Sequence, residues 1–183
     1  MERRADDLRE EWLVSDARRD RVAAMCLELF GGVPLTWGTE LNNELPQQAR
    51  NRGWVAVPVE RDSIWDDEAE ALVDALTDSI YESPLLILNL EPWSPAPACY
   101  ELPLNKNAIE HWAEKWWYGL FLVENEGFAI LENDEYHVWI ADPDFVETCL
   151  GDSVLNLRTR FRQYINEYHP VPSYLRIADF YGC

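Results

Sequence analysis

The chain has 183 residues, of which 48% are hydrophobic and 13% aromatic, and its formal net charge is -19. This apolar content excludes an intrinsically disordered chain, so there is enough material for a core and the excess charge must lie on its surface. No segment approaches the roughly 20 continuous apolar residues of a membrane helix, and the stretch from Met1 to Asp7 lacks the apolar run of a signal peptide. The four cysteines are widely spaced and form no C-x-x-C pair, which disfavours a zinc site. We expect a chain of a bacterial or phage cytoplasm, where cysteines stay reduced.

The acidic residues are concentrated in the middle of the chain. Residues 1–60 hold 11 acids and 8 bases, residues 61–150 hold 20 acids and 3 bases, and residues 151–183 hold 3 acids and 4 bases. The middle segment therefore carries -17 of the total charge of -19. Because a compact acidic surface repels itself, we interpret this concentration as a surface selected to meet positive charge, with general solubility as the alternative. Membranes and nucleic acids are anionic, which disfavours direct binding to either.

The first predicted element is a helical segment within residues 1–30. Ser15 is a suitable N-cap for its second half, and the apolar residues that follow share one face. Leu8 and Trp12 form a further apolar pair four residues apart, which favours a continuous helix from about Asp6.

A strand-helix-strand unit follows. Residues 54–59 and 85–90 are apolar runs typical of buried strands, and Ser63 caps a helix that is predicted to extend to about Tyr81. If these two strands pair in parallel, their crossover is expected to be right-handed.

The second half of the chain predicts helices around a three-stranded meander. Asn107, with Glu110 three residues later, resembles a capping box, and the meander is expected at residues 120–123, 128–131 and 136–140.

Two helices are predicted after the meander, one from Asp142-Pro143 to Gly151 and one from Ser153 to about Tyr168. Residues 174–178 are predicted to return as an edge strand. This order of elements predicts a single α+β domain over residues 1–183, with a mixed β-sheet built from a β-α-β unit and an antiparallel meander, and with helices on one or both faces.

The helix predicted after Ser63 carries acids along one side. The acids opposite its apolar stripe are Asp66, Asp67, Glu70, Asp74 and Asp78. Four of them recur every four residues with no lysine or arginine between them, although like charges at this spacing destabilise a helix by about 0.2–0.5 kcal/mol per pair. Neighbouring carboxylates lie about 6 Å apart along the axis, comparable to phosphates along a nucleic-acid strand. We therefore treat these acids as partner-binding candidates, with an ordinary solvated face as the alternative.

Further partner-binding candidates lie in predicted loops. They are Glu124 and Glu126 at the first turn of the meander, Glu132, Asp134 and Glu135 at the second, and Trp93 in a proline-broken loop. Turns favour Asp and Asn for backbone reasons, which do not account for glutamate. Tryptophan is favoured at interface hot spots, so Trp93 is a candidate anchor.

The sequence carries no pattern that indicates catalysis. The histidines His111, His137 and His169 are isolated, and no serine or cysteine is linked to them by a recognisable motif. The pair His111 and Glu114 has no second pair to complete a metal site, and the adjacent glycines Gly31-Gly32 follow a helix instead of opening one. We therefore expect no catalytic residue, no metal and no cofactor.

The leading hypothesis is a non-catalytic, cytoplasmic binding protein, monomeric or homodimeric, that neutralises a basic protein such as a toxin or a nucleic-acid-processing enzyme. In composition and size the chain is similar to immunity proteins of bacterial toxin systems, which implies an immunity or antitoxin role against a nuclease-like toxin. One alternative is a phage or mobile-element nucleic-acid mimic that inhibits a host defence enzyme. Another is a small enzyme or carbohydrate-binding module with a carboxylate pair and tryptophans.

Overall fold

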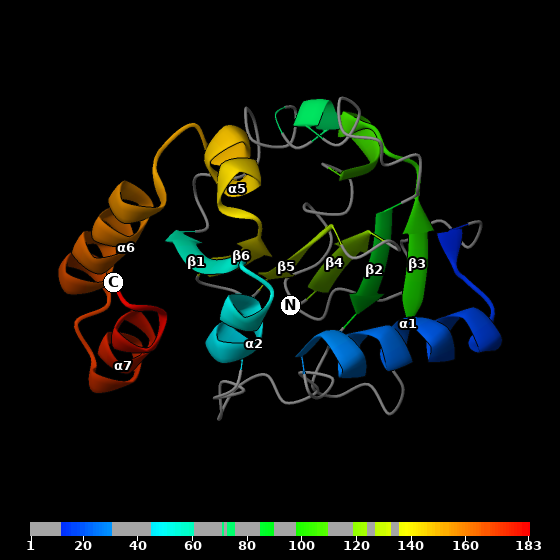
Figure 1. The fold of residues 1–183 in the computed structure, drawn as a ribbon, viewed down its shortest axis with the longest axis horizontal. Helices are drawn as coiled ribbons and strands as arrows, with labels where there is room; N and C mark the ends of the chain where they lie inside the picture. Colours follow the sequence, from blue (N-terminus) through cyan, green and yellow to red (C-terminus); the bar gives the residue numbers. More distant parts are fainter. Residues whose placement is uncertain are drawn as a thin grey trace, which may run out of the picture.

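A six-stranded β-sheet forms the centre of the fold (Figure 1). The structure, a computed structural model, describes residues 12–30, 45–60, 71, 73–75, 85–89, 98–109, 119–123, 127–132 and 136–183. The strands are β1 (Val55–Glu60), β2 (Leu85–Asn89), β3 (Cys99–Leu102), β4 (Gly119–Val123), β5 (Phe128–Glu132) and β6 (Tyr136–Ala141). Their order in the sheet is β1-β6-β5-β4-β2-β3.

Every strand pairing in this sheet is antiparallel. The α+β class and the meander, formed by β4, β5 and β6, are confirmed, whereas the prediction of a mixed sheet is wrong. The predicted β-α-β strands, β1 and β2, are not neighbours, because β6, β5 and β4 lie between them. All six residues of β6 are buried, and β6 lies between β1 and β5 in the sheet.

Helices cover both faces of the sheet (Figure 1). The face that includes Val57, Ile87 and Trp139 packs against α5 (Pro143–Leu150). The opposite face, which includes Leu86 and Ile140, packs against α1 (Asp16–Phe30), α2 (Leu45–Asn51), α6 (Val154–Tyr168) and α7 (Pro172–Tyr181). These helices therefore all pack against the same sheet.

Helix α6 packs along the outer edge of β1. Leu157 of α6 belongs to the core on one side of the sheet, and Phe161 to the core on the other side. The guanidinium of Arg158 donates a hydrogen bond to the carbonyl oxygen of Ala56 at 3.2 Å. Because residues two apart in a strand direct their backbone groups to the same side, Pro58 faces the same outer edge as Ala56. No strand pairs with β1 at this edge, so the missing N–H of Pro58 removes no hydrogen bond from the sheet, as expected of proline in an edge strand.

The opposite edge of the sheet is covered by the residues before α1. Leu13 forms an antiparallel bridge with Tyr100 of β3, and the N–H of Val14 donates to the carbonyl of Cys99 at 3.0 Å. Trp12 is buried in the core of the Trp139 face. Residues 13–15 are therefore not helical, and the prediction of a continuous helix from about Asp6 through residue 30 is wrong, because these residues pair with an edge strand.

The predicted edge strand at residues 174–178 is also wrong, since these residues form the middle of α7. Ala178 and Tyr181 are buried, while Tyr174 and Ile177 pack partly against the same core. This is the spacing of one helix face. Pro172 stands in the first turn of α7, where a missing N–H costs nothing, and α6 already covers the strand edge nearby.

The helix predicted from Asn107 begins two residues earlier. Asn105 accepts a hydrogen bond through Oδ1 from the N–H of Ala108 at 3.0 Å and is therefore the N-cap. By contrast, the caps predicted for α5 and α6 are confirmed. Asp142 accepts from the N–H of Asp144, Ser153 accepts from the N–H of Asn156, and Gly151 ends α5 with a φ of 66°.

Candidate functional site

Two of the predicted partner-binding residues, Asp74 and Glu132, lie within the described part of the chain. The others lie outside the described residues: Asp66, Asp67, Glu70, Asp78, Trp93, Glu124, Glu126, Asp134 and Glu135. The candidate site is therefore built from these two positions and from the described strands that lead into the remaining segments.

Asp74 lies on a helical segment that packs against the sheet. Residues 71 and 73–75 are helical, and Val73 and Ala75 are partly buried against the core of the Trp139 face. The side chain of Asp74 is exposed. No ion pair joins Asp74 to any described residue, so at this position the apolar side faces the core and the carboxylate faces solvent.

The two turns of the meander lie at opposite ends of the sheet. Residues 124–126 connect β4 to β5, and residues 133–135 connect β5 to β6. Between them β5 runs from Phe128 to Glu132, a length of roughly 13 Å at the rise of an extended strand. The described ends of β5, Phe128 and Glu132, therefore lie at opposite ends of the sheet.

One end of the sheet brings several candidate segments together. The strand register pairs Glu60 with Tyr136, Glu132 with both His137 and Gly119, and Gly119 with Asn89. These pairs form the last two rows at one end of the sheet, which we call the Glu60 end.

Three acidic or aromatic segments adjoin the Glu60 end. Residue 61 follows Glu60 on the way to the acids at 66–70, residue 90 follows β2 on the way to Trp93, and residues 133–135 join β5 to β6. Of the eleven candidates, Glu132 itself lies at this end of the sheet, at the end of β5. The positions of Asp66, Asp67, Glu70, Trp93, Asp134 and Glu135 lie outside the described residues.

Arginines from the two ends of the chain pair with acids that are not among the candidates. Arg18 contacts Glu101 at 2.8 Å, Arg160 contacts Glu60 at 3.2 Å, and Arg162 contacts Asp179 at 2.7 Å.

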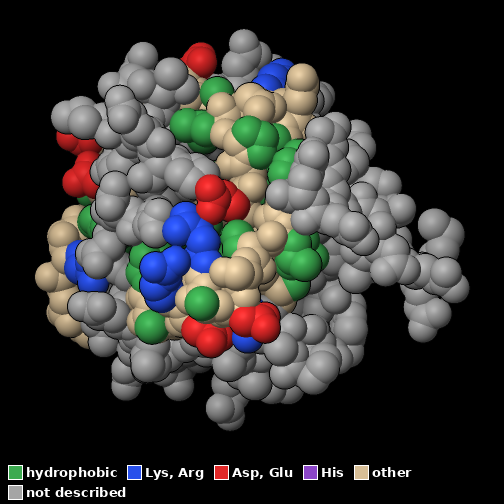
Figure 2. Space-filling view, turned by 90° about the vertical axis from the view of Figure 1, so that its right-hand side faces the viewer, with side chains coloured by type: hydrophobic (Ala, Val, Ile, Leu, Met, Phe, Trp, Pro, Cys, Tyr) green, Lys and Arg blue, Asp and Glu red, His purple; other side chains and the backbone are tan. Residues whose placement is uncertain are grey.

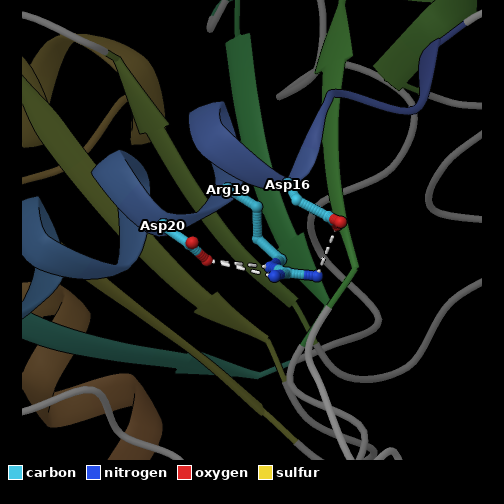
Figure 3. Close-up of polar contacts among 3 residues, drawn as sticks. All are labelled: Asp16, Arg19 and Asp20. Atoms are coloured by element: carbon cyan, nitrogen blue, oxygen red, sulfur yellow. Dashed lines mark hydrogen bonds and ion pairs between the residues drawn. The ribbon is translucent and has the colours of Figure 1, made fainter.

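Arg19 contacts both Asp16 at 2.9 Å and Asp20 at 3.1 Å (Figure 3). These α1 pairs belong to the side of the molecule near β3, where Lys and Arg side chains lie beside Asp and Glu side chains (Figure 2). This side therefore has mixed charge, unlike the uniformly acidic run at residues 66–78.

Cys99 and Cys149 are buried free thiols, and Cys183 is a half-buried one. Cys99 and Cys149 are 1% and 2% exposed, and desolvation by burial raises the pKa of each to about 12. Burial also raises the pKa of Cys183 to about 11. Since the thiolate is the reactive form of cysteine, none of these three side chains has the character of a nucleophile. Cys149 belongs to the core, while the Cys26 side chain lies outside the described residues.

The two described histidines, His137 and His169, lie in positions typical of structural residues. His137 is fully buried within β6, and the N–H of His169 donates to Ile165 at the C-terminus of α6. Tyr164 Oη and His169 Nε2 lie 2.9 Å apart, and the ring of Tyr174 is tilted against the imidazole with a centroid distance of 5.1 Å. In the described part of the chain, no three His, Cys, Asp or Glu side chains gather as metal ligands would. His111 lies outside the described residues.

Sequence reasoning missed two features near these elements. The ion pair of Arg160 and Glu60 joins residues 100 positions apart, which no local pattern indicates. The second is the ring cluster of Tyr164, Tyr168, His169 and Tyr174, in which Tyr168 is 63% exposed although it continues the apolar stripe of α6.

Known proteins offer no match. Comparison with protein-family models, with curated proteins and with solved structures finds nothing similar to this chain. Among the helices that the structure describes, none combines the length and the apolar character that crossing a bilayer requires.

Proposed function

We propose that this protein acts without catalysis, by capturing a basic protein through the carboxylates of residues 66–78 and of the segments that adjoin the Glu60 end of the sheet. The role that fits best is that of an immunity or antitoxin-type protein, which neutralises a nuclease-like toxin in a bacterial cytoplasm. Its partner is a cationic protein surface, such as a nucleic-acid channel.

The observation that carries this proposal is the concentration of charge in one part of the chain. Residues 61–150 contain 20 acids and 3 bases. Of the candidates, Asp74 is exposed on a helical segment and Glu132 ends β5, and the arginines described above are paired with carboxylates outside the candidate set. Such a surface attracts cations over a distance comparable to the Debye length, which accelerates association and makes it sensitive to salt.

A nucleic-acid mimic from a phage or mobile element is a second version of the same proposal. The helical conformation of residues 71 and 73–75, with Asp74 exposed, supports the carboxylate spacing of about 6 Å that this version needs. The two versions share the interface and differ in the partner, which is a toxin in the first and a host defence enzyme in the second.

The proposal is tested by reversing one described candidate charge. Asp74→Lys is compared with Glu167→Lys, which changes the charge equally at an exposed position on α6. The readout is binding of a fluorescein-labelled oligoarginine peptide, followed by anisotropy between low and physiological salt. Asp74→Lys is expected to weaken binding more than Glu167→Lys does. Equal weakening by both variants means that only net charge matters and contradicts a localised site.

A further inference from the structure

We draw no further inference here: the strongest candidate, the exposed apolar side chains of Tyr168 and Val171 at the turn between α6 and α7, carries none because nothing in the structure shows what covers them.

Discussion

The guanidinium of Arg158 donates a hydrogen bond of 3.2 Å to the carbonyl oxygen of Ala56, which attaches helix α6 to the outer edge of β1. On the opposite edge, Val14 donates to Cys99 of β3. Both outer strands are therefore covered by the chain itself, in the manner that protects a sheet from strand addition. Under the proposed function, we therefore expect the partner to engage surface side chains and not to extend the sheet.

Arg158→Ala is expected to lower the free energy of unfolding by about 0.5–1.5 kcal/mol, the usual contribution of one hydrogen bond. Urea denaturation followed by tryptophan fluorescence measures the change. Gln163→Ala on the exposed side of the same helix is the control and is expected to leave stability nearly unchanged. If the two variants have the same stability, the contact between Arg158 and Ala56 does not hold α6 on β1.

Ser153→Ala tests the start of α6. Ser153 Oγ accepts a hydrogen bond from the N–H of Asn156 at 3.2 Å, and the loss of such a cap costs about 1 kcal/mol. A matched change, Ser173→Ala, alters an exposed serine near the start of α7 and is expected to have little effect. Thermal unfolding of the two variants should therefore differ, with the lower Tm for Ser153→Ala.

Alkaline pH is expected to destabilise the protein through its buried thiols. The pKa of Cys99 and Cys149 is about 12 in the folded protein, raised from 9.0 by burial, so the unfolded chain releases these protons first. The stabilising contribution of the neutral thiols is complete below pH 9 and is lost as the pH rises toward 12. Each thiol accounts for up to about 1.4 kcal/mol per pH unit in this window.

Urea denaturation at a series of pH values above 8 measures this dependence, and Cys149→Ala should reduce its slope. A stability that stays constant between pH 9 and pH 11 would show that the thiols titrate normally and are therefore accessible to water.

The local parts of the fold could be predicted because their signals lie within a few residues. The caps at Asp142 and Ser153 and the terminator Gly151 each act through neighbouring backbone groups, so the sequence is sufficient to locate α5 and α6. The meander follows the same rule, because each of its strands pairs with the next one along the chain.

The wrong predictions concern segments whose structure depends on contacts with residues far away in the sequence. Strand β1 pairs with β6, which lies about 80 residues away, and no local pattern indicates a pairing at that distance. The aromatic and β-branched residues at 174–178 favour a strand by propensity. They form a helix because Ala178 and Tyr181 cover the core of the Phe161 face.

The candidate site shows the same division. The outward position of Asp74 follows from helical periodicity and was predictable, whereas the Glu60 end of the sheet depends on which strands pair. The contact between Arg160 and Glu60 joins a helix and a strand that are distant in sequence, so it was not predictable from either segment alone.

We propose above that the carboxylates at residues 66–78 capture a cationic partner. The most direct test is a triple variant with Glu70→Lys, Asp74→Lys and Asp78→Lys. Its affinity for labelled oligoarginine is measured at low salt, together with its Tm. We expect binding to be lost while the Tm is unchanged or higher, because the substitutions remove like-charge pairs that each cost about 0.2–0.5 kcal/mol. An affinity equal to that of the wild-type chain, in a variant that remains folded, would contradict the account.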